Sequence, residues 1–205
     1  YCHNPDSQPT KSDAAKQVSV KEIVDQLKKQ DSYFGEEGGL TVSGGEPTVQ
    51  AKELKKLFEA VKKEGFHITL DTCGAIFNEN INEVYDLADL VLLDVKHIDP
   101  VWHKKLTGHN NDNVLKNANY REKSGKLMWL RYVLVPGWTD QPEYLEQWAQ
   151  YFKDFKTIDR VEILPYHELG VYKYAELGIP YKLEGVKPAT IEQAKAAKNI
   201  FDKYL

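Results

Sequence analysis

The residues best suited to chemistry in this chain lie within, or just after, short apolar runs that have the character of buried strands. They comprise two glycines, several carboxylates, a lysine, an arginine and a histidine: Gly44, Gly45, Glu46, Asp71, Thr72, Asp94, Lys96, Arg131 and His167. In parallel β/α folds, ligands bind at the carboxyl ends of the strands. We therefore expect these residues, one set from each strand, to meet at a single site.

Two neighbouring glycines, Gly44 and Gly45, follow the apolar run Leu40–Val42 and precede Glu46 and Pro47. Glycine lets a ligand come close to the backbone. The N–H and C=O groups at this strand end therefore suit a free amino group that has a carboxylate nearby. A plain loop between a strand and a helix is the alternative interpretation of this motif.

Asp94 interrupts an otherwise continuous apolar run, and a buried carboxylate without a partner costs several kcal/mol. Lys96 shares its strand face, and Arg131 is a second candidate partner, so a simple ion pair is one interpretation. Asp71 could equally cap a loop, and His167 could be a loop histidine with satisfied hydrogen bonds. Cys73 is better explained as a small buried apolar residue than as a metal ligand.

The order of the expected elements predicts how these residues are positioned. Each expected strand precedes a helical segment, which favours a parallel sheet with right-handed crossovers, either doubly wound or a partial barrel. We expect one domain over 1–205, with a polar loop at 1–17 and β/α units over 18–205. Strands are expected at 40–42, 67–70, 90–95, 127–135 and 161–164, and helices at 20–30, 48–64, 81–88, from 113, around 144–148 and at 190–204.

Composition excludes several classes of protein. Of the 205 residues 41% are apolar, which is enough for one compact core, and the formal net charge of −4 is spread without long runs. Neither a nucleic-acid groove nor an anionic membrane surface is indicated. There is no apolar run of the roughly 20 residues that span a bilayer. Two cysteines make no disulfide framework, so we expect a soluble cytoplasmic protein.

In its motifs the chain resembles the radical S-adenosylmethionine (SAM) enzymes, and among them the glycyl-radical enzyme activases, closest to those that activate pyruvate formate-lyase. No cysteine lies between Cys2 and Ser43, whereas many other activases carry a cysteine-rich insert there. The stretches that carry the resemblance are Tyr1-Cys2-His3-Asn4, Ser43-Gly44-Gly45-Glu46, Leu70-Asp71-Thr72, Leu93-Asp94-Val95-Lys96, Trp129-Leu130-Arg131-Tyr132, Val135-Pro136-Gly137-Trp138, Leu164-Pro165-Tyr166-His167-Glu168-Leu169-Gly170 and Gly185-Val186-Lys187-Pro188.

The resemblance implies a partial (β/α)6 barrel whose first strand is missing from this chain. It also implies a [4Fe-4S] cluster held by a Cys-x3-Cys-x2-Cys motif, of which Cys2 would be the last cysteine. The other two would lie before Tyr1, so the chain looks truncated at its beginning. We expect the 205-residue chain by itself to be inactive and to show no cluster absorbance after anaerobic reconstitution, in contrast to a full-length protein.

The resemblance further implies roles for individual residues. Cys2 would ligate the cluster, and a monovalent cation would bind the side chains of Asp71 and Asp94 and the backbone carbonyls of Thr72 and Leu92, since hard oxygen donors suit such an ion. The residues implied to line the SAM site are Tyr1, Cys2, His3, Gly44, Gly45, Glu46, Asp94, Val95, Lys96, Arg131 and His167.

The implied activity is the generation of a glycyl radical in pyruvate formate-lyase, part of anaerobic metabolism. Reductive cleavage of SAM at the cluster would give methionine and a 5′-deoxyadenosyl radical, which would take a hydrogen atom from a backbone glycine of the partner. Flavodoxin or a similar protein would donate the electron. The alternatives are an activase of another glycyl-radical enzyme, a radical SAM enzyme acting on a small molecule, and a cluster-free α/β protein that binds a metabolite or a partner.

Overall fold

Five parallel strands form one sheet in the sequential order β1-β2-β3-β4-β5 in the structure, a computed structural model that describes all residues except 1, 8–14, 36–37 and 205. A doubly wound sheet would reverse this order near its middle. The sequential order confirms the predicted partial barrel and excludes the doubly wound alternative. The strands are β1 (Gly39–Val42), β2 (His67–Thr72), β3 (Leu90–Asp94), β4 (Met128–Leu134) and β5 (Ile158–Pro165).

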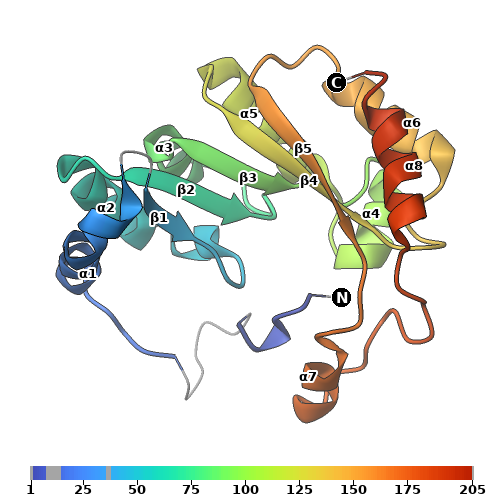
Figure 1. Cartoon of the computed structure of the whole chain (residues 1–205), viewed down its shortest axis with the longest axis horizontal. Coiled ribbons are helices and arrows are strands. Elements are labelled where there is room, and N and C mark those ends of the chain that lie inside the picture. Colours follow the sequence, from blue (N-terminus) through green and yellow to red (C-terminus); the bar gives the residue numbers. More distant parts are fainter. Residues whose placement is uncertain (1, 8–14, 36–37, 205) are drawn as a thin grey trace.

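Helices connect the strands and cover the outer face of the curved sheet, whereas η1 and α7 lie beyond the carboxyl ends of the strands (Figure 1). Capping residues place several helix starts, among them the capping box of Ser19 and Glu22 at α1. The helices are η1 (Pro5–Ser7), α1 (Val20–Phe34), η2 (Pro47–Gln50), α2 (Ala51–Lys63), α3 (Glu79–Leu87), α4 (Pro100–Thr107), α5 (Asp112–Ser124), α6 (Pro142–Phe152), α7 (Val171–Glu176) and α8 (Ile191–Phe201).

Side chains of the central strands alternate between the two faces of the sheet. In β4, for example, Leu130 and Tyr132 are buried on the outer face, where they join the core beneath the helices, while Arg131 and Val133 lie on the inner face. The core includes Phe58, Ile68, Leu93, Trp148 and Phe201. The same alternation turns Asp71 and Asp94 to the inner face beside Arg131.

The structure corrects the sequence prediction at five places. α4 and α7 were not expected, because each is short and has few apolar residues at helical spacing. β2 continues to Thr72, so Asp71 belongs to a strand and does not cap a loop. The helix expected from Thr48 begins as the 3-10 turn η2, and Pro5–Ser7 of the predicted loop forms η1.

No helix within the described residues is both long and apolar enough to cross a bilayer.

Candidate cofactor-binding site

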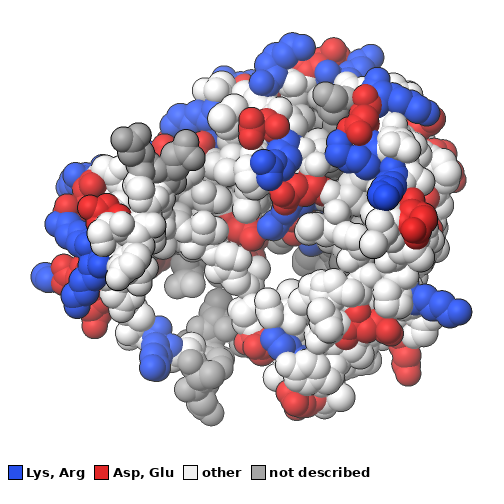
Figure 2. Space-filling model, in the orientation of Figure 1, with Lys and Arg blue, Asp and Glu red and all other residues white. Residues whose placement is uncertain are grey.

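A cavity of about 740 Å³ lies at the carboxyl ends of the strands and brings together most of the predicted site residues. In Figure 2, acidic and basic side chains lie next to each other in the hollow near the middle of the face shown. The predicted residues that line the cavity are Cys2, His3, Gly44, Gly45, Asp71, Thr72, Asp94, Lys96, Arg131 and His167.

Four charged side chains form a network on the inner face of β2, β3 and β4. Arg131 donates from Nε to Asp94 Oδ1 at 2.7 Å. Its two Nη atoms donate to the two carboxylate oxygens of Asp71, and the bond from Nη1 to Oδ2 is 3.0 Å long. Lys96 Nζ donates to Asp94 Oδ2 at 3.1 Å. The sheet register makes this possible, since Asp94 pairs with Arg131 across the β3–β4 ladder. The predicted ion pair of Asp94 is therefore present and includes both candidate partners.

The charge network (Asp71, Asp94, Lys96 and Arg131) favours the ionised forms of Asp94 and Arg131. Burial acts to raise the pKa of Asp94, but the cations of Lys96 and Arg131 outweigh it and lower that pKa below its ordinary value. Burial acts to lower the pKa of Arg131, and the carboxylates of Asp94 and Asp71 raise it overall. Two anions and two cations balance each other at this edge of the sheet.

Glu46 is bound within the protein and does not line the cavity. Its carboxylate accepts from the Thr48 backbone N–H at 3.0 Å, as an N-cap, and from Thr72 Oγ1 at 2.7 Å and the Cys73 N–H at 2.8 Å. Glu46 therefore ties the turn after β1 to the end of β2. Gly44 and Gly45, which come just before it, have φ angles of 88° and 56°, and glycine adopts this region without strain.

Two histidines far apart in the sequence stack against each other at the cavity. The rings of His3 and His167 have their centroids 3.8 Å apart and are inclined by 20°. Partial burial lowers the pKa of His3, and the neighbouring His167 lowers it further by a smaller amount. This contact holds the loop that carries His3 against the loop that carries His167, at one wall of the cavity.

The two cysteines differ in their surroundings. Cys2 is exposed at the cavity, and its Sγ accepts from the Asn4 backbone N–H at 3.3 Å. Burial, together with the nearby carboxylate of Glu46, raises the pKa of Cys73 to about 12, so this thiol stays protonated at neutral pH. The sequence was interpreted as placing a small buried apolar residue here, and not a metal ligand; Cys73 is only partly buried, and its protonated thiol is a poor metal ligand.

Besides Glu46, three further predicted residues do not line the cavity or lie outside the described residues. The side chain of Val95 is fully buried in the core, and its backbone carbonyl accepts from Trp148 Nε1 at 3.2 Å. Leu92 contributes no side chain to the cavity, although its backbone lies beside Asp71 in the β2–β3 register. Tyr1 lies outside the described residues.

Some residues that line the cavity were not predicted from the sequence. Ser7 lies in a stretch without apolar periodicity, and Tyr174 and Ile179 belong to a segment for which we expected no helix. Ser43 stood next to the glycine pair and was not singled out, yet its Oγ donates to Asp71 Oδ2 at 3.2 Å. The Pro-Tyr-His-Glu stretch that precedes α7 was the available signal that this part of the chain reaches the site.

The donors around the cavity fit one implied cofactor better than the other. The volume lies within the usual range for small-molecule sites, and the two cations, two carboxylates and glycine turn suit a ligand such as SAM that carries both charges. A [4Fe-4S] cluster of this kind takes three thiolates, and Cys2 is the exposed cysteine at this cavity. Among the described residues, no three side chains of His, Cys, Asp or Glu are grouped to hold a metal ion.

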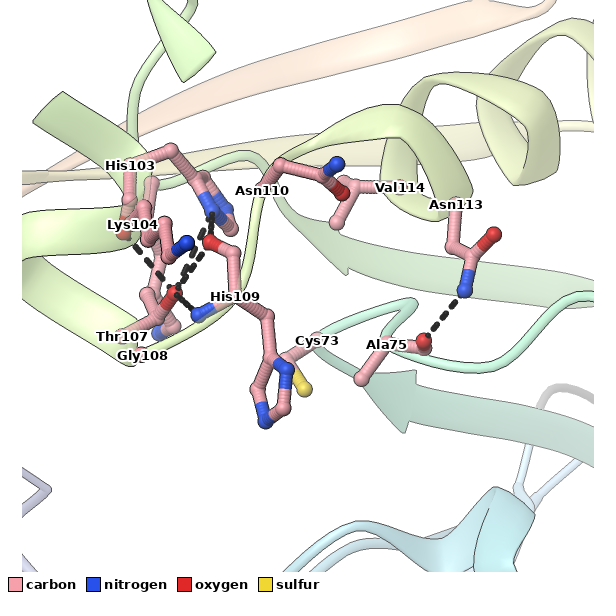
Figure 3. A pocket seen from close by; sticks show the side chains of 11 residues that line it. Cys73, Ala75, His103, Lys104, Thr107, Gly108, His109, Asn110, Asn113 and Val114 are labelled. Carbon is pink, nitrogen blue, oxygen red and sulfur yellow. Dashed lines mark hydrogen bonds between the residues drawn. The ribbon is translucent and has the colours of Figure 1, made fainter. Parts of the chain in front are cut away.

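A second cavity, of about 390 Å³, adjoins the first and shares Cys73, Lys96 and Thr107 with it. Figure 3 shows His109 beside Cys73, with the helix end that carries His103 above them. His103 Nδ1 lies 2.7 Å from the carbonyl oxygen of His109, a contact that orders the loop after α4.

Known proteins with similar sequences are radical SAM enzymes, in agreement with the motifs. The Radical SAM superfamily matches residues 1–149. A pyruvate formate-lyase-activating enzyme of Streptococcus mutans is 44% identical over 98% of this chain and 78% of its own length. A pyruvate formate-lyase 1-activating enzyme of Escherichia coli is 36% identical over 100% of this chain and 83% of its own length.

A solved domain of a pyruvate-formate lyase-activating enzyme from Bacteroides vulgatus has the same fold. Its TM-score is 0.68 at 21% identity, and the match covers 82% of this chain and 94% of that domain.

Proposed function

The chain belongs to the radical SAM superfamily, within it to the pyruvate formate-lyase-activating enzymes, and on this premise we propose that it generates a glycyl radical in pyruvate formate-lyase. The observation that carries the proposal is the single cavity in which Cys2, the glycine turn, the charge network and His167 meet. When bound, the cluster would supply one electron for the reductive cleavage of SAM, and SAM would supply the group that takes a hydrogen atom from a backbone glycine of pyruvate formate-lyase.

The residues of this chain bind and orient SAM in the proposal. The backbone at Gly44 and Gly45 receives the amino group, and Lys96 attracts the carboxylate. His167 covers the nucleoside end, and Arg131 fixes the carboxylates that surround the ligand. Because the protein already fixes these charged side chains in place, they position the ligand without having to rearrange during the reaction. Cys2 would supply one thiolate to the cluster.

A monovalent cation at Asp71, Asp94 and the carbonyls of Thr72 and Leu92 is a further part of the proposal. The β2–β3 register, which places Leu92 beside Asp71, supports it. Arg131 already binds both carboxylates, so the ion and the guanidinium compete for the same oxygens. We expect an ion to bind only where the guanidinium moves aside. The electron donor, flavodoxin or a similar protein, and a cytoplasmic location belong to the same proposal.

The first test is binding of SAM to the chain, measured by calorimetry. We expect Lys96→Met to weaken binding about tenfold, which is the worth of one charge-assisted contact of 1–2 kcal/mol. Lys195→Met is the matched control, because Lys195 is an exposed lysine of α8. Equal affinity of the wild type and Lys96→Met for SAM would show that Lys96 does not contact the ligand.

The second test is activity. A segment Cys-x3-Cys-x is placed directly before Tyr1, and the protein is reconstituted anaerobically with iron and sulfide. With SAM, a reductant and pyruvate formate-lyase, we expect a glycyl-radical signal by electron paramagnetic resonance, and none from the Cys2→Ser variant. A signal only on a different glycyl-radical enzyme would favour that activase alternative. Binding of SAM without any cleavage would favour the cluster-free alternative.

A further inference from the structure

The sheet leaves an open side between its two edge strands. β1 and β5 stand at opposite ends of the strand order, and no strand among the described residues joins them. The segment Cys2–Ser7 crosses this opening (Figure 1). On the β1 side, Ser7 Oγ accepts from the Gly45 backbone N–H at 3.0 Å. The segment is thus attached to the glycine turn that follows β1.

On the β5 side, two residues of α7 hold the same segment. Lys173 Nζ donates to Asn4 Oδ1 at 2.8 Å and to Asp6 Oδ1 at 3.0 Å. The hydroxyl of Tyr174 donates to the backbone carbonyl of Cys2 at 3.0 Å, and Tyr174 itself is 7% exposed. Because Tyr174 is packed in place, its hydroxyl fixes the backbone of Cys2 at a defined position.

Gly170, the residue that precedes α7, allows the close approach. Its φ of −102° is one that any residue adopts, so the backbone conformation does not require glycine. A Cβ on Gly170 would lie 2.7 Å from the carbonyl oxygen and 2.8 Å from the Cα of His3. Backbone contact with His3 is therefore possible only without a side chain at this position. The stacking of His3 on His167 depends on the same approach.

We infer that Gly170, Lys173 and Tyr174 are positioning residues, which hold Cys2–Ser7 across the open side of the sheet so that Cys2 and His3 face the cavity. The C-terminal segment thereby sets the position of the N-terminal one. The identity of the ligand that Cys2 and His3 face rests on the proposed function. The attachment of Cys2–Ser7 to Gly170, Lys173 and Tyr174 does not. The proposal gives these three residues no contact with the reacting groups, although Tyr174 lines the cavity, and they act through the segment Cys2–Ser7.

Hydrogen exchange of the amides in Cys2–Ser7, followed by mass spectrometry on the 205-residue chain without added cofactor, tests the inference. The Ser7 N–H donates to the Asn4 carbonyl at 3.1 Å and the Asn4 N–H to Cys2 Sγ, so their exchange reports local order. We expect faster exchange, by about tenfold in Gly170→Ala and several-fold in Tyr174→Phe and Lys173→Met. Tyr172→Phe is the control, because Tyr172 is an exposed tyrosine of the same helix.

Lys173→Arg keeps a cation within reach of Asp6, so we expect it to restore most of the protection that Lys173→Met loses. Wild-type exchange in both Tyr174→Phe and Lys173→Met would overturn the inference, even where Gly170→Ala does not fold. Affinity for SAM, measured on the same variants, separates the two proposals. Faster exchange in a chain that never binds SAM would refute the proposed function alone, and unchanged exchange in a chain that binds SAM would refute the positioning role alone.

Discussion

The two walls of the main cavity are held by different kinds of contact. The strand-borne wall, made of Asp71, Asp94, Lys96 and Arg131, is built on paired strands, and its charges bind one another. The loop-borne wall, made of residues 2–7, His167 and α7, has few backbone pairings and depends on individual side chains. The strand-borne wall is therefore part of the fold, whereas the loop-borne wall is attached to it by side-chain contacts.

Removing the central cation should break the strand-borne wall and the fold with it. Arg131→Met leaves the carboxylates of Asp71 and Asp94 facing each other, both about four-fifths buried. We expect the free energy of unfolding, measured by urea denaturation, to fall by about 3 kcal/mol, as for other broken buried pairs. Arg160→Met is the control, since its partner Glu162 is 3.5 Å away at the surface and the pair is worth little.

A loss below about 1 kcal/mol in Arg131→Met would show that the charge network is dispensable for folding. The double variant Arg131→Met with Asp71→Asn sharpens the measurement. It removes one stranded carboxylate, so we expect it to be more stable than Arg131→Met alone.

Acid should destabilise the framework behind the strand-borne wall through His97, which follows β3 and is fully buried. Its Nδ1 accepts from the Asp99 N–H at 3.0 Å, and burial lowers its pKa from 6.5 to about 4. Between these two values the unfolded chain binds the proton and the folded chain does not. Stability is therefore full above the ordinary pKa and is lost as pH falls toward about 4.

The largest loss from this group is about 3 kcal/mol, from the size of the shift. The measurement is urea denaturation at several pH values for the wild type and for His97→Asn, which keeps an acceptor for the Asp99 N–H. We expect the difference between the two curves to vary across this window. Parallel curves would show that His97 titrates alike in the folded and unfolded chains.

Loosening the loop-borne wall should have the smallest effect on the fold. Lys173→Met combined with Tyr174→Phe removes three contacts to residues 2–6, none of which reaches the core. We expect the free energy of unfolding to change by less than about 1 kcal/mol, because the affected segment lies outside the cooperative unit. A loss as large as that of Arg131→Met would show that both walls fold as one.

The same contrast explains how much of the molecule could be predicted from its sequence. The alternation of apolar and polar residues is local, so the strands and the inner-face positions of Asp71, Asp94 and Arg131 could be read directly. The contact of Lys173 with Asp6 joins residues 167 positions apart and leaves no local pattern. The internal role of the Glu46 carboxylate was hidden for the same reason, because its partner Cys73 is 27 positions away.

Glycines illustrate the limit within a single residue type. Gly44 and Gly45 stood out because they are adjacent and follow an apolar run, and both take positive φ angles. Gly170 has an ordinary φ, and its reason for being glycine is the backbone of His3, which only the folded chain brings near. A glycine required by a distant neighbour cannot be recognised by turn chemistry.

The period of two along β4 makes the site sensitive to chain length. Deleting one residue there ahead of Arg131, such as Trp129, would carry the guanidinium to the helix-covered side and bring an apolar neighbour inward. Variants that replace residues in this strand can keep the ionic centre, whereas a shift by a single position removes it together with the packing behind it. Natural insertions and deletions in such proteins should therefore collect in the connections and avoid the strands.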